Sequence, residues 1–289
     1  MVLVAVVGLL LLPCLAHSQQ YTVTVLGTLG GYAGYGTRIS ASGQVTGYST
    51  NTGNFANAFF YGNGSVQNLG TLGGKVSYGF GINASGQISG YSQTGLASGV
   101  EHAFLYSNGV MQDLGTLGGT TSFGSGINAS GQVTGSALTS SGVEHAFLYS
   151  NGVMQDLGTL VGGATSYGYD INASGQVTGW ATTASGATNA FLYSNGVMQN
   201  LGTLGGTTSF GYGINASGQV TGWAFTSSGV EHAFLYSNGV MVDLNSEIGS
   251  ATGYTLVSGE AINDSGQIVV DASVIATGQN LVLLLTPTS

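Results

Sequence analysis

The chain has 289 residues, of which 52 are glycine, and its formal net charge is −9 with Arg38 and Lys75 as the only basic residues besides histidine. Nucleic acids and anionic lipid surfaces are bound through several Lys or Arg contacts, so this composition excludes both as partners of the mature protein. The hydrophobic fraction of 43% is large enough for a folded core, although only 4% of the residues are charged.

Residues 1–18 have the pattern of a secretory signal peptide. An apolar run over residues 1–16 leads to a small-x-small cleavage site at Ala16-His17-Ser18, and this run is shorter than the roughly 20 residues of a transmembrane helix. No Lys or Arg precedes the run, which departs from the usual pattern. The only cysteine, Cys14, lies in this segment, so we expect residues 19–289 to form a single, secreted or surface-bound repeat domain without disulfides.

Six copies of one motif divide the mature chain. The sequence ISASGQ at 39–44 returns as INASGQ at 82–87, 127–132, 171–176 and 214–219, and as INDSGQ at 262–267. Twenty residues, SGVEHAFLYSNGVMQDLGTL, occur identically at 98–117 and 141–160. A period near 44 residues fits the four-stranded blade of a β-propeller.

The third copy shows the order of elements that we expect in every repeat. A strand over 122–128 is followed by a turn at Asn128-Ala-Ser-Gly131, which has the residues of a type I turn, and by a second strand over 132–138. A polar loop leads to a third strand over 145–150, and Asn151-Gly152 predicts a type I′ hairpin to a fourth strand over 153–158. The strands are rich in β-branched and aromatic residues, so the repeat predicts an up-and-down sheet.

The two ends of the chain complete the count. The sixth copy supplies two strands and a third over 280–286, but no fourth. Residues 21–31, YTVTVLGTLGG, match the fourth strand and its exit in the other copies, as in VMQDLGTLGG. We therefore predict an all-β fold: a six-bladed β-propeller of four-stranded blades, closed by the N-terminal strand that completes the last blade and leaves no open sheet edge.

The motif Gly-x-x-His-Ala-Phe-x-Tyr, followed by Asp-Leu-Gly-Thr-Leu-Gly-Gly, resembles the HAF repeat of exported bacterial proteins. It stands at His102, His145 and His232, whereas Asn57 and Asn189 replace histidine in two other copies. The resemblance covers essentially the whole mature chain and implies export and a β-propeller-like repeat array. It carries no catalytic residues.

The three repeated histidines are candidates for a metal site, because each follows a glutamate. Neighbouring strand residues such as Glu101 and His102 point to opposite faces, however, and the asparagines that replace histidine keep its hydrogen bonding without its affinity for metals. We expect each histidine to make a hydrogen bond that ties the third strand to a neighbouring loop. The sequence therefore predicts no metal and no cofactor.

Two sets of aromatic residues are expected at the same end of the blades, together with the longer loops, which makes one face of the ring loop-rich and aromatic. The first set lies before the Ile of each first strand: Tyr35, Tyr78, Phe123, Tyr167 and Phe210. The second set ends the second strands: Tyr48, Tyr91, Trp180 and Trp223. Packing between blades explains the first set. The two tryptophans fit either packing or a surface on which a ligand stacks.

Two carboxylates next to the inner-strand Ile, Asp170 and Glu260, are the only catalytic candidates, and we include them with Tyr48, Tyr91, Trp180 and Trp223 as candidate ligand-binding residues. A single such pair is weak support for catalysis. No G-x-S-x-G, H-E-x-x-H or P-loop pattern is present, and Arg38 has no second arginine with which to build a sialidase-type site.

Three functions remain open at this point. The first is a secreted, non-enzymatic and monomeric propeller that binds an extracellular glycan or protein on its loop-rich face. The second is a hydrolase or lyase with a site near the central channel that uses Asp170 and Glu260. The third is a structural repeat protein of the cell surface or matrix. Because the copies differ mainly in the loops between the second and third strands, a binding site is expected there.

Overall fold

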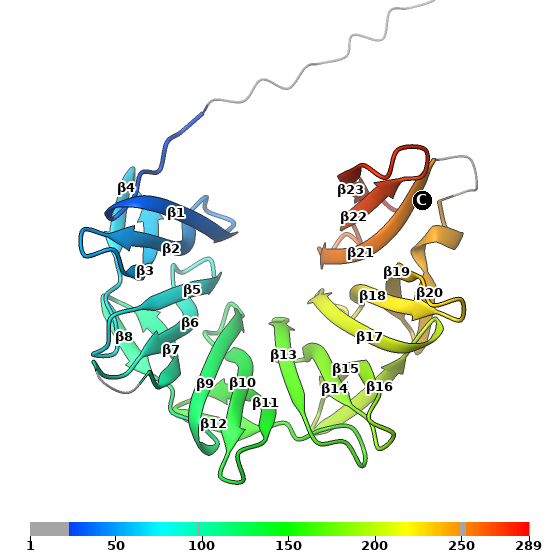
Figure 1. The fold of residues 1–289 in the computed structure, drawn as a ribbon, viewed down its shortest axis with the longest axis horizontal. Coiled ribbons are helices and arrows are strands. Elements are labelled where there is room, and N and C mark those ends of the chain that lie inside the picture. Colours follow the sequence, from blue (N-terminus) through cyan, green and yellow to red (C-terminus); the bar gives the residue numbers. More distant parts are fainter. Residues whose placement is uncertain (1–22, 97–98, 249–252, 289) are drawn as a thin grey trace, which may run out of the picture.

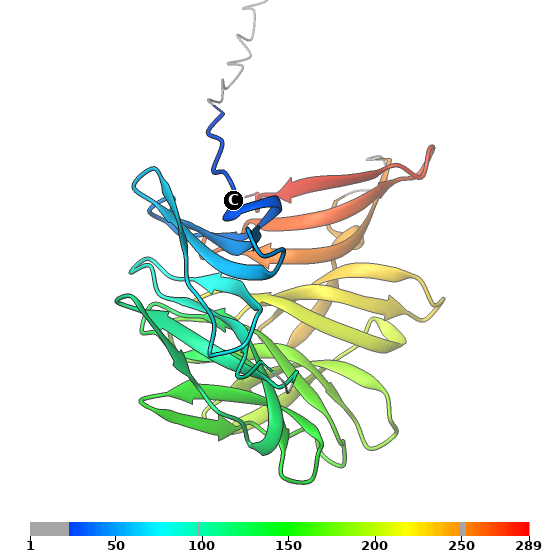
Figure 2. The ribbon, with the colours of Figure 1, turned by 60° about the vertical axis from the view of Figure 1, so that its left-hand side comes forward.

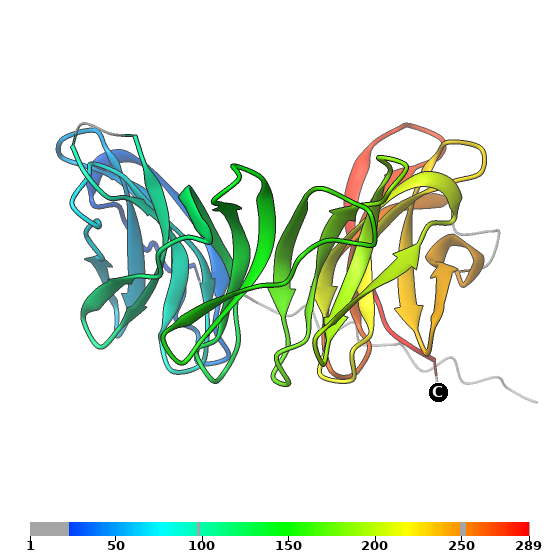
Figure 3. The same cartoon turned by 90° about the horizontal axis from the view of Figure 1, so that it is seen from below.

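The computed structural model describes residues 23–96, 99–248 and 253–288. They form six antiparallel sheets, five of four strands and one of three, and within each sheet the strands follow one another in chain order. The sheets succeed one another around a common centre (Figure 1), and they stand on edge side by side (Figure 3). The architecture is therefore all-β and propeller-like, as the repeat predicts. The predicted signal peptide, residues 1–18, lies outside the described residues.

The first three sheets have these bounds. Sheet one contains β1 (Gly30–Ile39), β2 (Val45–Asn51), β3 (Ala56–Gly62) and β4 (Ser65–Asn68). Sheet two contains β5 (Ser77–Ile82), β6 (Ile88–Gln93), β7 (Glu101–Ser107) and β8 (Val110–Asp113). Sheet three contains β9 (Gly118–Ile127), β10 (Val133–Thr139), β11 (Glu144–Ser150) and β12 (Val153–Asp156).

The last three sheets continue the series. Sheet four contains β13 (Ser166–Ile171), β14 (Val177–Thr182), β15 (Thr188–Ser194) and β16 (Val197–Gly202). Sheet five contains β17 (Gly205–Ile214), β18 (Val220–Thr226), β19 (Glu231–Ser237) and β20 (Val240–Asp243), followed by the 3-10 turn η1 (Leu244–Ser246). Sheet six contains β21 (Tyr254–Ile262), β22 (Ile268–Val274) and β23 (Asn280–Leu285).

Both predicted turns are present. In the hairpin between the third and fourth strands, Asn151 and Gly152 have φ angles of 52° and 83°, which a type I′ turn requires and which Asn and Gly adopt most readily. In the turn between the first and second strands, the Gly131 amide donates to the Asn128 carbonyl (3.0 Å) and the Asn128 amide donates to Gln132 (3.1 Å). The local sequence thus fixes strand length and register.

Apolar side chains fill each of the five junctions between consecutive described sheets. One sheet contributes a fully buried alanine of its third strand and a leucine at the end of its fourth strand or just after it. The next sheet contributes the Ile or Val that begins its second strand and, in the first four junctions, a Phe and a Tyr of its third strand. At the junction of sheets one and two, these residues are Ala58, Leu69, Ile88, Phe104 and Tyr106. Sheet stacking therefore supplies the core, and each sheet depends on its neighbour.

A row of hydrogen bonds reinforces the junctions at the tight-turn end. The Asn83 side chain donates to the Asn128 carbonyl of the next sheet (3.0 Å), and Asn128 does the same to Asn172 (3.0 Å). Asn172 and Asn215 continue the row to the fifth and sixth sheets. The INASGQ motif is thus both a turn and a link between sheets.

The predicted closure of the ring is not confirmed. In the described residues, sheet six has three strands, and residues 23–29 form no strand with β23. Instead, the Leu29 amide donates to Ser49 Oγ (3.0 Å), so this segment is anchored to sheet one and leads away from it (Figure 2). Sheets one and six stand apart (Figure 1), and the anchored segment therefore does not reach the edge of β23.

The repeated histidines bond within their own sheets rather than to a neighbouring loop. The Nδ1 atoms of His102, His145 and His232 lie 2.9, 2.9 and 2.7 Å from carboxylate oxygens of Asp113, Asp156 and Asp243 on the fourth strands. Where asparagine replaces histidine, the fourth-strand residue changes as well. Asn189 donates to Asn200 (2.9 Å), and Asn57 pairs with Asn68 (3.4 Å).

This paired exchange predicts how the sheets respond to substitution. His145→Leu leaves Asp156 without its partner and should lower the free energy of unfolding by about 1 kcal/mol, because the pair is partly exposed. The double variant His145→Asn with Asp156→Asn recreates the Asn189–Asn200 pair and should lie within about 0.5 kcal/mol of the parent. Urea unfolding measures both values. A double variant as unstable as His145→Leu would contradict this role.

Candidate functional site

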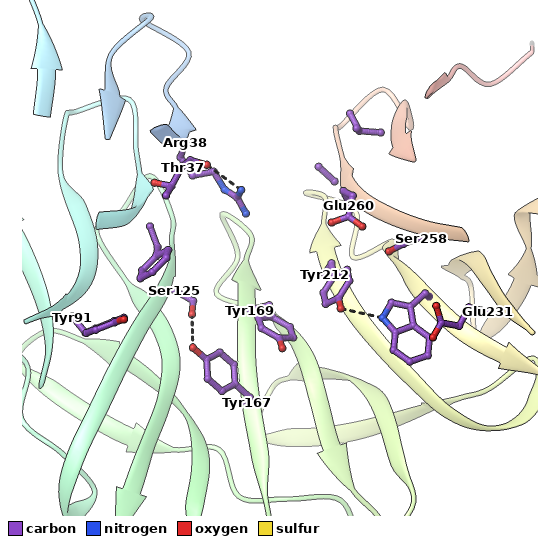
Figure 4. A pocket seen from close by; sticks show the side chains of 14 residues that line it. Thr37, Arg38, Tyr91, Ser125, Tyr167, Tyr169, Tyr212, Glu231, Ser258 and Glu260 are labelled. Atoms are coloured by element: carbon purple, nitrogen blue, oxygen red, sulfur yellow. Dashed lines mark hydrogen bonds between the residues drawn. The ribbon is translucent and has the colours of Figure 1, made fainter. Parts of the chain in front are cut away.

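One position in the first strand of each sheet faces the centre of the arc. It follows a glycine that comes after the aromatic residue in five copies and after Ser258 in the sixth, and its six occupants are Thr37, Phe80, Ser125, Tyr169, Tyr212 and Glu260. All six line a single cavity of about 910 Å³ (Figure 4). The glycine before this position is the same in every copy, and an isoleucine follows two residues later in each. The position itself carries five residue types, so it varies within an otherwise repeated strand.

An irregularity in the first strand directs these side chains to the centre. The pairing of β13 with β14 shifts between Gly168 and Asp170, so Tyr169 has no partner residue opposite it. The same shift occurs between Gly211 and Gly213 around Tyr212, and between Gly259 and Ala261 around Glu260. A β-bulge of this kind re-aims a side chain. The preceding glycine is needed because a Cβ at Gly168 would collide with the Thr134 hydroxyl of the previous sheet.

Tyrosines and a tryptophan form one wall of the cavity. The rings of Tyr169 and Tyr212 lie 5.3 Å apart, edge to face, and Trp223 Nε1 donates to the Tyr212 hydroxyl (3.0 Å). On the neighbouring strands, the Tyr167 hydroxyl bonds Ser125 Oγ (3.1 Å). Burial raises the pKa of Tyr169 to about 12, so its hydroxyl stays protonated and can donate a hydrogen bond at any physiological pH.

The predicted aromatic candidates divide into two groups. Tyr91 and Trp223 line the cavity, whereas Tyr48 and Trp180 are not among its lining residues. Tyr48 stacks on Tyr35 (5.1 Å) and meets Tyr78 edge to face (4.9 Å), within a row of rings that joins sheets one and two. Trp180 packs 5.9 Å from Phe210 of the next sheet. The structure thus places two of the four in packing positions between sheets.

The two candidate carboxylates do not share a site. Glu260 lines the cavity, but Asp170 occupies the following position of the first strand, where the other copies have Gly, Ala or Arg, and does not line it. The two Asp170 oxygens accept hydrogen bonds from the backbone amides of Ile171 (2.9 Å) and Ile214 (3.1 Å). Burial raises the pKa of the Asp170 carboxyl, although both amides and the Arg38 guanidinium oppose the shift. Asp170 therefore links sheets four and five.

The remaining charges of the cavity lie on different strands. Arg38, at the end of β1, donates from Nη1 to the carbonyl of Thr37 (3.4 Å), while Glu260 lies on β21 and Glu231 begins β19. Figure 4 shows Arg38 on one side of the cavity and both glutamates on the other. Among the described residues, the ion pairs are the three His–Asp pairs, so these three side chains have no partner of opposite charge within 4 Å.

Two features are absent from residues 23–96, 99–248 and 253–288. No group of three or more His, Cys, Asp or Glu side chains is placed to hold a metal ion. No helix in this part of the chain is long and apolar enough to span a membrane.

The variable central position is a site that the sequence analysis missed. Asp170 and Glu260 are both carboxylates near the Ile of the first strand, but they occupy successive rather than equivalent positions of that strand. Alignment of the six copies on the glycine would have separated them. It would also have shown that the position of Glu260 changes from copy to copy while its neighbours stay the same.

Sheets arranged in chain order around a cavity to which each contributes one side chain define an all-β protein of propeller-like architecture. Residues 76–285 match the model of the family described as "Protein of unknown function (DUF3466)", and the chain belongs to this family. The matching model is not one of HAF repeats, so the resemblance to that family is not confirmed.

Solved structures provide further comparisons. A putative TolB from Agrobacterium tumefaciens is 12% identical, with a TM-score of 0.49 over 86% of this chain and 79% of that one. TolB from Acinetobacter baumannii is 10% identical, with a TM-score of 0.49 over 84% and 63%. A gluconolactonase from Xanthomonas campestris is 13% identical, with a TM-score of 0.38 over 76% and 80%. A comparison with curated proteins finds no match.

The environment of Asp170 predicts a dependence of stability on pH. Because its pKa is raised in the folded state, the folded protein binds this proton more readily than the unfolded chain above pH of about 4, and stability falls as pH rises through the raised pKa. Asp170→Asn cannot ionise, so its free energy of unfolding should lack this decrease. Urea unfolding between pH 4 and 8 measures the difference between parent and variant, with the exposed Glu247→Gln as control. Parallel curves for parent and Asp170→Asn would show that the carboxyl is not perturbed.

Proposed function

We propose that this protein is an exported, non-enzymatic binding protein whose ligand is a glycan held in the central cavity at the loop-rich face. One observation carries the proposal: the residue that faces the cavity differs among the copies, whereas the strands that present it repeat. Stacking between sheets explains why the strand residues repeat. It does not constrain the identity of a side chain that points into the cavity. Variation at this position therefore supports selection for a ligand.

The lining favours a carbohydrate over a protein surface. Tyr169, Tyr212 and Trp223 offer ring faces on which a sugar ring can stack. Hydroxyl groups of the tyrosines and Ser125 can donate to and accept from sugar hydroxyls, and the Glu231 carboxylate can accept from them. The volume of about 910 Å³ lies within the range of small-ligand sites and suits a short oligosaccharide.

The alternative of a hydrolase or lyase that uses Asp170 and Glu260 receives less support. General acid–base cleavage of a glycosidic bond uses two carboxyl groups on either side of the bond. Asp170 is engaged by two backbone amides outside the cavity, and Glu260 is left without its proposed partner. A purely structural role is disfavoured for a different reason, since it does not explain the variable central position.

Export rests on the signal-peptide pattern of residues 1–18. The mature chain is proposed to be secreted or held at the cell surface, where glycans are available, and to act as a monomer without a cofactor.

Binding is tested with substitutions that the fold already contains. Tyr169→Ser and Tyr212→Ser place at the fourth and fifth sheets the residue that Ser125 provides in the third. Each should weaken the Kd for a retained oligosaccharide about 2- to 10-fold, because one stacking contact is lost, and leave the melting temperature nearly unchanged. A glycan array followed by calorimetry measures the Kd. Tyr32→Ser, at an exposed tyrosine outside the cavity, is the matched control. Equal affinities in all three variants would exclude this site.

We also propose that the six sheets are the blades of a closed propeller in which residues 21–31 supply the missing fourth strand beside β23. The match of this segment to VMQDLGTLGG supports the assignment. So does its composition, because Val23 and Val25 are exposed where they stand now. Addition of this segment beside β23 would pair the free backbone N–H and C=O groups of that edge, which otherwise offers a site for aggregation.

The strand assignment predicts the effect of a short deletion. Removal of residues 19–26 from the mature chain should lower the melting temperature by several degrees and promote aggregation, because the edge of β23 stays open. Removal of residues 19 and 20 alone, which precede the matching segment, should have no effect. Differential scanning calorimetry and light scattering compare the two. A chain without residues 19–26 that melts like the mature protein would contradict the assignment.

A further inference from the structure

Sheet six leaves uncovered the face that every other sheet buries. Val282 occupies the third-strand position of Ala58 and is 70% exposed, whereas the five alanines at that position are fully buried. Leu284, two residues further along, is 61% exposed, and Val269 beside it on β22 is 37% exposed. The counterparts of Val269 in the other sheets have no exposed surface: Thr46, Ser89, Thr134, Thr178 and Thr221. This face, which is apolar apart from Asp271 opposite Val282, thus lacks the sheet that covers it elsewhere.

Sheet one is uncovered on the opposite face. Ile39, at the end of β1, is 69% exposed, whereas its counterparts Ile171 and Ile214 are 5% and 6% exposed. Ile82, Ile127 and Ile262 also pack in the junction with the preceding sheet. Val45, Phe59 and Tyr61 hold the positions of Ile88, Phe104 and Tyr106, which face the preceding sheet in the first junction. Sheet one therefore carries half of a junction without its other half.

We infer that these two faces, on sheets six and one, bind each other and form a seam. An ion pair between Arg38 and Glu260 stabilises this seam on the side of the central channel. This inference rests on the proposed closed propeller and specifies how it closes. The seam would be a sixth apolar cluster, built from the same positions of the repeat as the other five. Its members are Leu26, Ile39, Val45, Phe59, Tyr61, Val282 and Leu284. Leu26 comes from the N-terminal segment and takes the place of the leucine that follows a fourth strand, as Leu69 does.

The row of turn asparagines also ends at this seam. Asn263 donates to Gln267 (2.9 Å), as each of its counterparts does to the equivalent glutamine, but the described residues give its amide no carbonyl in a following sheet. The Ser40 carbonyl is the equivalent acceptor on sheet one and already accepts from Gly43 in the same way as Asn128 accepts from Gly131. Closure would give Asn263 the bond that Asn215 makes.

The charges on the central strands are placed for the same seam. Central residues of adjacent sheets touch, as Tyr169 and Tyr212 do at 5.3 Å. Packing of sheet six on sheet one would place Glu260 in the position of Tyr169, with Thr37 and Arg38 in the positions of Tyr212 and Gly213. Arg38 is the only arginine in the chain, and three of its five counterparts are glycine. A cation and an anion thus stand on the two sheets that flank the gap.

The partner face belongs to the same chain rather than to a second copy. Head-to-tail packing of separate chains would build an open filament, since the same two faces would recur at each end. Within one chain, the tether between sheets keeps the faces at a high effective concentration. Leu26 adds to this, because it lies a few residues before the strand that carries Ile39 and would have to fill the same cluster.

Carbodiimide coupling tests the contact directly. In Arg38→Lys, the new amine would attack the activated Glu260 carboxyl; an amide bond forms, and the carboxyl oxygen leaves with the reagent as a urea. Peptide mass spectrometry of the full mature chain should find this link in monomers, and Glu260→Gln in the same background should remove it. Links confined to dimers and larger species would overturn the inference in favour of a filament, and the absence of any link would overturn it outright.

Charge reversal gives an independent measure that does not depend on ligand binding. Arg38→Glu and Glu260→Arg should each increase the unfolding equilibrium constant. The constant of the double reversal should be about threefold smaller than the product of the two single effects predicts. Arg38→Glu with Glu231→Arg is the matched control, because Glu231 lines the same cavity on sheet five and should give no recovery. Additive effects in both pairs would refute the ion pair. Failure of the glycan tests leaves these readouts unchanged, so the two proposals fail separately.

Discussion

The structure depends on the way each sheet covers its neighbour. A fully buried alanine on one third strand lies against the Phe and Tyr of the next sheet, and a glycine before the bulge lets consecutive first strands approach. A larger residue at either place would separate the sheets. No single sheet has a core of its own, so stability accumulates junction by junction. This explains why twenty residues can be copied without change, since every junction imposes the same requirements.

The same constraint determines where variation is possible. The strand faces are fixed by stacking, and the turns are fixed by their φ angles. The side chain that the bulge directs into the central cavity is constrained neither by stacking nor by turn geometry. Threonine, phenylalanine, serine, tyrosine and glutamate are therefore all compatible with the fold at that position. A repeat protein can change its ligand there without change to its core, which separates the evolution of binding from that of stability.

Local chemistry explains what could be predicted from the sequence. Asn-Gly pairs and the INASGQ turn predict the hairpins, and β-branched and aromatic runs predict the strands, because both depend on a few neighbouring residues. The partner of His145 was missed because it lies eleven residues away across a strand pair, and only the joint exchange of both residues to asparagine, as in Asn189 and Asn200, reveals it. The central position was missed because a bulge alters the alternation of side chains. Closure depends on contacts between the two ends of the chain, and local sequence patterns do not predict such contacts.

The scarcity of charge gives the remaining charges a specific meaning. Three aspartates are paired with histidines, and Asp170 is held by two backbone amides. In the cavity, Arg38, Glu231 and Glu260 are not neutralised in this way. A closed seam would join Arg38 to Glu260 and leave Glu231 beside Tyr212 and Trp223 at the aromatic wall. The carboxylate that then remains free to accept hydrogen bonds from a ligand is Glu231, so closure would determine the polarity of the site as well as its shape.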